Sequence, residues 1–150
     1  MSGEFIDSNV FVYLFDDADE RKRGIADGIV ESALKESGAS ISFQVVQETL
    51  NVLTRKLPEP MTAEDAELFL DRVLAPLWRV WPSLALYRRA LEVQARYRYG
   101  FHDALIVAAA LDAGCARLYS EDLQDGQKIE GLEIENPFRG GRMRDWRRGD

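Results

Sequence analysis

The chain has 150 residues, of which 46% are hydrophobic and 30% charged, as is usual for a single globular domain. Its single cysteine, Cys115, excludes an internal disulfide, and with only one histidine the chain cannot supply a zinc site built from His and Cys. The apolar run near the start is interrupted by Asp7 and Asn9, and no run is long enough to span a membrane. We therefore expect a cytoplasmic protein.

The formal net charge is -7, but it is unevenly distributed. Residues 139–150 contain five arginines and two aspartates, so the preceding part is more acidic than the whole chain. We expect a folded domain over residues 1–138 and a flexible, Arg-rich tail over residues 139–150. An acidic body argues against nucleic-acid binding unless some of its carboxylates hold a metal ion, which reverses the local field.

In chain order, short apolar segments alternate with amphipathic ones. Strands are predicted at residues 4–7, 39–43, 78–81, 117–120 and 132–135. A helix is expected from Val10, capped by Ser8 or Asn9, and further helices are expected to end at Glu36 and to cover residues 44–55, 63–75, 84–98 and 103–113. Two of these, 44–55 and 63–75, would form a helical hairpin. The alternation predicts the α/β class, with a five-stranded parallel sheet and helices on both faces.

The stretch 99–125 carries the strongest local pattern. Residues 104–111 are small and apolar on nearly every side, as in a helix buried against a sheet. Gly114 stands where a left-handed residue ends such a helix. Asp103 opens this helix, and Glu121 and Asp122 follow the next strand. Buried carboxylates are costly unless a cation satisfies them, so these positions suggest a cation site.

Four acids occupy special places: Asp7 after the first strand, Glu48 in the first half of a helix, Asp103 at a helix start, and Asp122 after the fourth strand. Taken singly, Asp7 is equally well explained as a cap and Glu48 as a dipole partner. In a parallel sheet the strand ends and the following helix starts share one edge, so the acids can converge. Oxygen ligands suit Mg²⁺ or Mn²⁺, and such a site is suited to phosphodiester hydrolysis.

Other enzyme classes fit the sequence poorly. No glycine-rich phosphate loop is present, and no nucleophile-elbow motif accompanies His102. Asn9 stands where a haloacid-dehalogenase-like phosphatase would need a second aspartate. Trp81-Pro82 stands where a receiver domain would need its phospho-accepting aspartate.

Several segments then carry a family resemblance. They are FIDSNVFVYLF around Asp7, SFQVVQETLNVL around Glu48, YGFHDALIVAAAL around Asp103, LYSEDLQDGQ around Asp122, and the closing EIENPF. In their order and spacing these segments resemble the PIN-domain family, particularly the VapC-type toxin ribonucleases. The resemblance extends from Phe5 to about Phe138. It implies a PIN-like three-layer sandwich.

The resemblance also implies an activity, a cofactor and partners. The activity would be Mg²⁺- or Mn²⁺-dependent endoribonuclease cleavage of RNA by the toxin of a type II toxin–antitoxin pair. Asp7, Glu48, Asp103 and Asp122 match the family's acidic positions. A small antitoxin would cover the active-site groove, and a homodimer is expected, with the 62–78 hairpin as one surface that could serve it. A non-catalytic PIN-like module that binds RNA or protein is the alternative.

Five further residues are candidates for supporting roles around these acids. Ser120 matches a small hydroxyl residue of the family that could orient a carboxylate, and Asn9 could do the same beside Asp7. Glu121 or Asp125 could assist or replace Asp122. His102 is more simply explained as a surface residue stacking on Phe101 than as a contact to substrate phosphate, although both interpretations stay open.

Overall fold

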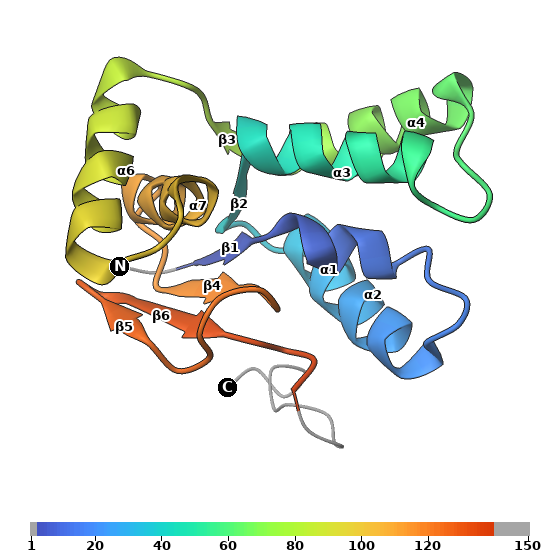
Figure 1. Ribbon diagram of the computed structural model, residues 1–150. Coiled ribbons are helices and arrows are strands. Elements are labelled where there is room, and N and C mark those ends of the chain that lie inside the picture. The colour runs from blue at the N-terminus through green and yellow to red at the C-terminus, as the bar shows by residue number, and fades with distance from the viewer. Residues whose placement is uncertain (1–2, 140–150) are drawn as a thin grey trace.

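The computed structural model describes residues 3–139 as an α/β fold around a six-stranded sheet (Figure 1). The strands are β1 (Glu4–Ile6), β2 (Ala39–Ser42), β3 (Trp78–Val80), β4 (Arg117–Tyr119), β5 (Lys128–Ile129) and β6 (Leu132–Glu135). The helices are α1 (Ser8–Tyr13), α2 (Glu20–Lys35), α3 (Phe43–Arg55), α4 (Ala63–Phe69), α5 (Ala75–Leu77), α6 (Leu84–Tyr97) and α7 (Phe101–Asp112), with a π-helical turn, η1 (Leu70–Leu74), between α4 and α5.

The strand order is β3-β2-β1-β4-β6-β5. Every neighbouring pair from β3 to β6 is parallel, and these are the five strands predicted from the sequence. The predicted α/β class is therefore confirmed. The sequence prediction missed β5, which pairs antiparallel with β6 through a tight turn in which Glu130 has a φ of 54°. A strand of two residues is too short to show the alternation by which strands are recognised.

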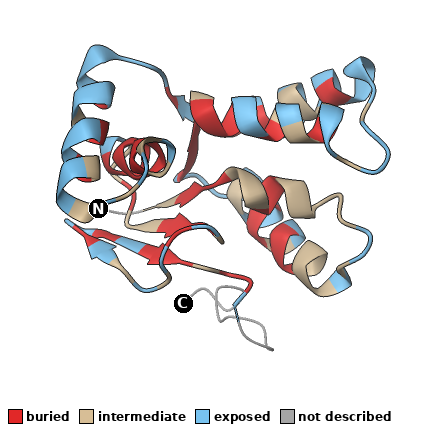
Figure 2. Ribbon diagram, viewed as in Figure 1, coloured by how far each residue is buried: buried red, intermediate tan, exposed pale blue. Residues whose placement is uncertain are grey.

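Helix α7 lies against the sheet, where α6 covers its other side (Figure 1). All eight residues from Ala104 to Leu111 are buried, which explains why this helix is apolar all round. Figure 2 shows α7 buried on most of its surface, whereas α6 is buried mainly on one side. Gly114 follows α7 with a φ of 72°, so the helix ends as predicted.

The first helix differs in detail from its prediction. It begins at Ser8, and its N-cap is Asp7, whose carboxylate accepts a hydrogen bond from the Ser8 backbone N–H at 2.7 Å. The prediction that the helix begins at Val10 with Ser8 or Asn9 as cap is therefore wrong. Asp7 can cap the helix because it keeps an extended conformation at the end of β1.

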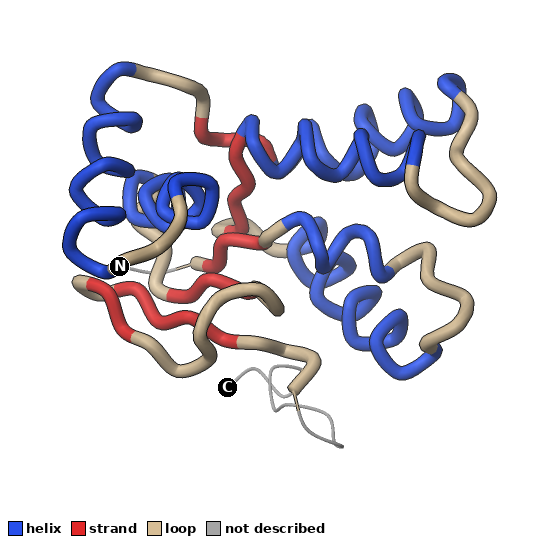
Figure 3. The backbone as a smooth tube through the Cα atoms, viewed as in Figure 1, coloured by secondary structure: helices blue, strands red, loops and turns tan. Residues whose placement is uncertain are grey.

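Between β2 and β3 the chain forms the predicted helical hairpin, with α3 running beside α4 (Figure 3). Thr62 caps α4 by accepting a hydrogen bond from the Asp65 backbone N–H at 3.1 Å. Among the described residues no helix is both long and apolar enough to cross a membrane. The predicted flexible tail lies, apart from Arg139, outside the described residues.

Candidate functional site

Asp7 lies at the carboxyl end of β1 and is only 6% exposed. One carboxylate oxygen accepts the Ser8 backbone N–H, and the other accepts the Ser120 hydroxyl at 2.7 Å. The two donors come from different segments, because Ser8 begins α1 and Ser120 directly follows β4. The parallel pairing of β1 with β4 brings these segments together. The carboxylate is fixed in orientation before any ligand arrives.

Ser120 connects Asp7 to the loop after β4. Its hydroxyl oxygen accepts the Asp122 backbone N–H at 3.2 Å while donating to Asp7. The Asn9 side-chain amide donates to the Asp122 carboxylate at 3.2 Å, and its carbonyl oxygen accepts the Glu121 backbone N–H at 3.4 Å. Asn9 therefore contacts Asp122 and its loop, whereas the sequence suggested a role beside Asp7.

Glu48 lies in the second turn of α3, and Asp103 lies in the first turn of α7. Gln44, one turn before Glu48, is 6% exposed, and its amide donates to the His102 backbone carbonyl at 3.0 Å. This bond joins the start of α3 to the start of α7. Sequence reasoning missed Gln44, because a glutamine inside an amphipathic helix gives no local sign that it bridges to another helix.

The four acids influence one another electrostatically. The pKa of Asp7 is raised to about 6, chiefly by burial and also by the charges of Asp122 and Asp103, against the lowering effect of its hydrogen bonds. The pKa of Glu48 is raised to about 7, chiefly by withdrawal from water and also by the charges of the other three carboxylates. The pKa of Asp103 is raised by desolvation and by Asp122, and lowered by His102. Such mutual repulsion marks a site where a cation would be favourable.

Two other acids of the same loop are occupied elsewhere. Glu121 accepts hydrogen bonds from Lys22 at 2.6 Å and from the Tyr13 hydroxyl at 2.5 Å. Asp125 accepts the Asn136 backbone N–H at 2.8 Å and pairs with Arg139 at 2.7 Å. Asp122 is the acid of this loop whose charge raises the pKa of Asp7, Glu48 and Asp103. That Glu121 or Asp125 assists or replaces Asp122 stays a prediction.

His102 is exposed, and its ring meets Phe101 edge-on at 6.2 Å between ring centroids. The exposure of His102 agrees with the interpretation as a surface residue, although its contact with Phe101 is edge-on and not stacked. Contact of His102 with substrate phosphate stays a prediction.

The donor set is suited to a hard divalent cation, because all four side chains supply carboxylate oxygens. Within residues 3–139, however, no group of three or more His, Cys, Asp or Glu side chains is arranged so that it could hold a metal ion. Asp7 is buried and held by two hydrogen bonds, whereas Glu48 and Asp122 are exposed, with Asp122 bonded to the Asn9 amide. The cluster therefore has the chemistry of a metal site without its final geometry.

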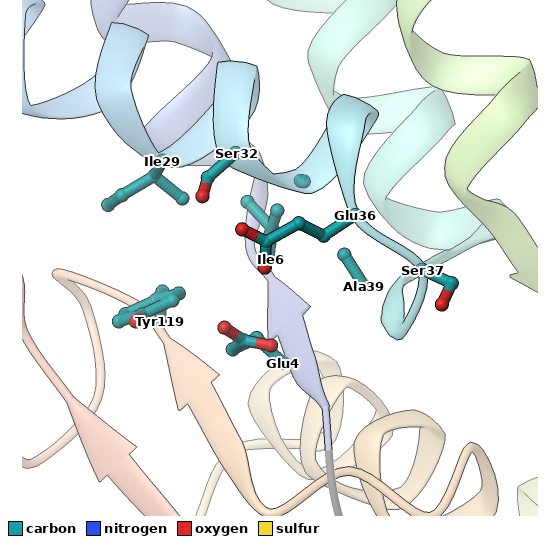
Figure 4. A pocket seen from close by; sticks show the side chains of 9 residues that line it. Glu4, Ile6, Ile29, Ser32, Glu36, Ser37, Ala39 and Tyr119 are labelled. Carbon is teal, nitrogen blue, oxygen red and sulfur yellow. The ribbon is translucent and has the colours of Figure 1, made fainter. Parts of the chain in front are cut away.

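A separate pocket lies between α2 and the strands β1 and β4 (Figure 4). It is open to solvent, and Glu4, Glu36 and Tyr119 are among the residues that line it. None of the four clustered acids lines it. We therefore place the candidate site at the acids and not in this pocket.

Together, the parallel sheet and the acids at its carboxyl edge define an α/β protein whose candidate site depends on carboxylates. A model of the PIN domain family matches residues 5–125, which is most of the chain. The chain belongs to the PIN domain family. The predicted family resemblance is therefore confirmed.

Solved structures show the same fold, although no curated protein matches the chain. VapC20 of Mycobacterium tuberculosis, described as a sarcin–ricin loop cleaving toxin, is 24% identical over 80% of this chain and 90% of its own, with a TM-score of 0.60. A toxin–antitoxin complex from Klebsiella pneumoniae is 20% identical over 87% of this chain and 95% of its own, with a TM-score of 0.62. VapBC2 of Rickettsia felis, bound to a fragment of its promoter DNA, is 18% identical over 89% of this chain and 97% of its own, with a TM-score of 0.61.

Proposed function

We propose that the chain is a Mg²⁺- or Mn²⁺-dependent endoribonuclease. The observation that carries the proposal is that, within a PIN domain, the charges of Asp122 and Asp103 raise the pKa of Asp7, and those of Asp7, Asp103 and Asp122 raise the pKa of Glu48, which supports a shared site. Carboxylates that repel one another weaken a fold unless a ligand compensates them. A bound divalent cation would supply that compensation.

The four acids would hold the cation, with Asp7 as the fixed ligand. Glu48 and Asp122 are exposed and would turn toward it. The bound ion would lower the pKa of an attacking water and stabilise charge on the phosphate. Ser120 and Asn9 act on the carboxylates, since Ser120 holds Asp7 and Asn9 holds Asp122.

The direct test incubates the purified chain with total RNA in Mg²⁺ or in EDTA and maps the cleaved ends. Cleavage should require the metal and should be lost in Asp103→Asn. Asp112→Asn is the matched control, because Asp112 is an exposed acid at the other end of the same helix. Intact RNA, or cleavage that survives in EDTA or in purified Asp103→Asn, would contradict the assignment.

A second candidate function is a PIN-like module that binds RNA or protein without cutting it. The lack of a preassembled metal arrangement among residues 3–139 favours this alternative. It predicts RNA or protein binding that is indifferent to Mg²⁺ and to Asp103→Asn. The same incubation, followed by a binding measurement on the uncleaved RNA, separates the two functions.

We further propose that the chain is a cytoplasmic toxin paired with a small antitoxin. The support is the likeness of its fold to toxins solved in complex with their antitoxins. The acidic cluster would favour a partner that presents a basic side chain. Expression of the chain alone should arrest bacterial growth, and a short reading frame overlapping it upstream should relieve the arrest. Unimpaired growth on expression of the soluble chain would contradict the toxin assignment.

Homodimerisation stays a prediction. The hairpin of α3 and α4 offers one apolar contact surface, since Leu68 on α4 is 46% exposed. Light scattering of the unaltered chain and of Leu68→Lys would test it. The unaltered chain should have twice the monomer mass and the variant should dissociate.

A further inference from the structure

A cluster of aromatic side chains lies beside the acids. Tyr87 on α6 stacks on Phe101, with ring centroids 6.3 Å apart and an angle of 8° between the ring planes. Phe43 meets Tyr87 at 6.4 Å, and His102 meets Phe101 at 6.2 Å. We call Phe43, Tyr87, Phe101 and His102 the aromatic patch.

The aromatic patch is continuous with the acidic cluster. Phe43 begins α3, the helix of Glu48, and Phe101 and His102 begin α7 just before Asp103. The Gln44 bond to the His102 carbonyl keeps these two helix starts together. A strand of RNA with a phosphate at the acids would therefore pass the aromatic rings.

Tyr87 is not required by the core. Phe43 and Phe101 pack against the core cluster, whereas Tyr87 does not belong to it and is 37% exposed. Aromatic rings are usually buried, because their large apolar area stabilises the fold most when water is excluded. An exposed ring stacked beside a polar site is suited to contact with a ligand.

The charge of the adjoining segment favours an anionic ligand. Residues 84–100 contain four arginines and one glutamate in a chain whose net charge is -7. Arg89 pairs with Glu130 at 2.9 Å. Arg88, next to Tyr87, is exposed and forms no ion pair with any residue in the described range 3–139. Arginines of this kind attract a phosphate backbone.

We propose that the aromatic patch is a stacking surface for the bases of single-stranded RNA next to the bond that is cleaved. This inference rests on the proposed nuclease function and adds the residues that would bind the bases beside the acids. Unpaired bases stack on aromatic rings, whereas the bases of a duplex are already stacked on one another. The aromatic patch, and Tyr87 in particular, would therefore supply the contact to a base.

Binding is best measured apart from cleavage. Every protein in the experiment is the full chain with the background substitution Asp7→Asn, which should prevent cleavage of the probe. The probe is a mixed-sequence single-stranded oligoribonucleotide that contains 2-aminopurine. Stacking on an aromatic ring quenches the fluorescence of 2-aminopurine. This signal therefore reports the contact between base and ring, whereas a substitution that only perturbs the fold would not produce it. Anisotropy of the same probe gives the dissociation constant.

Tyr87→Ala should weaken binding by about 5- to 100-fold, which is the range for losing one base–aromatic stack, and should abolish the quenching. Tyr87→Phe should retain both, and Tyr87→Leu, which keeps apolar volume without a π-face, should not. Leu91→Ala is the control, because Leu91 is 54% exposed on the same helix and belongs to no ring contact among the described residues. It should leave both readouts unchanged.

Unchanged affinity and quenching in Tyr87→Ala would overturn the stacking surface, while metal-dependent cleavage by the unaltered chain would still support the nuclease. If Tyr87→Ala kept RNA binding but dissociated a dimer, the aromatic patch would be a protein contact and the inference would be wrong. An unaltered chain that neither binds nor cleaves RNA would overturn both the nuclease and the stacking surface.

Discussion

The Ser120 hydroxyl donates to the Asp7 carboxylate at 2.7 Å across the ends of two neighbouring strands, although the residues are 113 positions apart in the chain. The same hydroxyl accepts the Asp122 backbone N–H at 3.2 Å. One small side chain thus orients the most buried acid of the site and positions the loop of another. Its hydrogen bond also lowers the pKa of Asp7, against the effect of burial.

Ser120→Ala should therefore weaken both the fold and the site. Removing a partner from a buried carboxylate costs about 1–3 kcal/mol of stability, which urea unfolding at neutral pH would measure. RNA cleavage should fall as well. Ser40→Ala is the matched control, because Ser40 is a buried serine on β2, paired with Phe5 and away from the acids. Equal activity of the two variants would contradict the role given to Ser120.

The metal-free chain should lose stability as the pH rises. The pKa of folded Asp7 is about 6, above its ordinary value of 3.8, so the folded state binds the proton more tightly than the unfolded state. This contribution is fully present below about pH 4 and is lost as the pH rises through about 6. The raised pKa of Glu48, about 7, acts in the same direction.

Asp7→Asn should remove much of this pH dependence while abolishing cleavage. At neutral pH in EDTA the variant should be more stable than the unaltered chain by about 1–3 kcal/mol, since it no longer buries a charge. The asparagine carbonyl can still accept the Ser8 N–H, and its amide can donate to the Ser120 hydroxyl oxygen in place of the bond that Ser120 donates to Asp7. Denaturant unfolding at acidic and neutral pH measures the effect, and a less stable variant at neutral pH would refute it.

Added Mg²⁺ or Mn²⁺ should raise the melting temperature of the unaltered chain, because a ligand that binds only the folded state stabilises it. Asp103→Asn should lose most of this gain, and Asp112→Asn at the far end of α7 should keep it. Thermal melts with metal and with EDTA are sufficient. This measurement does not depend on knowing the RNA target. Equal gains in the two variants would exclude Asp103 as a ligand.

Lys22 should help to hold the loop that carries Asp122. Its ammonium group bonds Glu121 and the Tyr13 hydroxyl, and it lies over the Tyr13 ring at 4.8 Å from the centroid. Both charged side chains of the pair are 26% exposed, so a double-mutant cycle of Lys22→Met and Glu121→Gln should give a coupling of only about 0.5–1 kcal/mol.

The matched control for Lys22→Met is Arg23→Met, because Arg23 pairs with Asp17, whose side chain is 94% exposed. Loss of that pair should have no measurable effect on stability. Metal affinity, followed by the same thermal melts, should fall in Lys22→Met and stay unchanged in Arg23→Met. The reverse order would show that the loop does not need the Lys22 contact.

The sequence alone was sufficient for features that depend on local patterns. The five parallel strands, the apolar helix α7 and its end at Gly114 follow from hydrophobic periodicity and from the conformational freedom of glycine. The order of the acidic motifs was enough to identify the PIN family. Each strand, helix and motif is recognised within one short segment, and the family follows from the order of the motifs along the chain.

Contacts between distant segments were decided only by the tertiary structure. The ion pair of Lys22 with Glu121 joins residues 99 positions apart, and the bond of Gln44 to the His102 carbonyl joins residues 58 apart. The exposed Tyr87 against Phe101 is of the same kind. Side-chain types specify which partners are acceptable, but parallel pairing and helix packing decide which partners meet. The sequence thus predicted a site of four acids from their places along the chain, and the fold decided that Asp7 is held by Ser8 and Ser120, that Glu121 bonds Lys22 and Tyr13, and that Tyr87 stacks on Phe101.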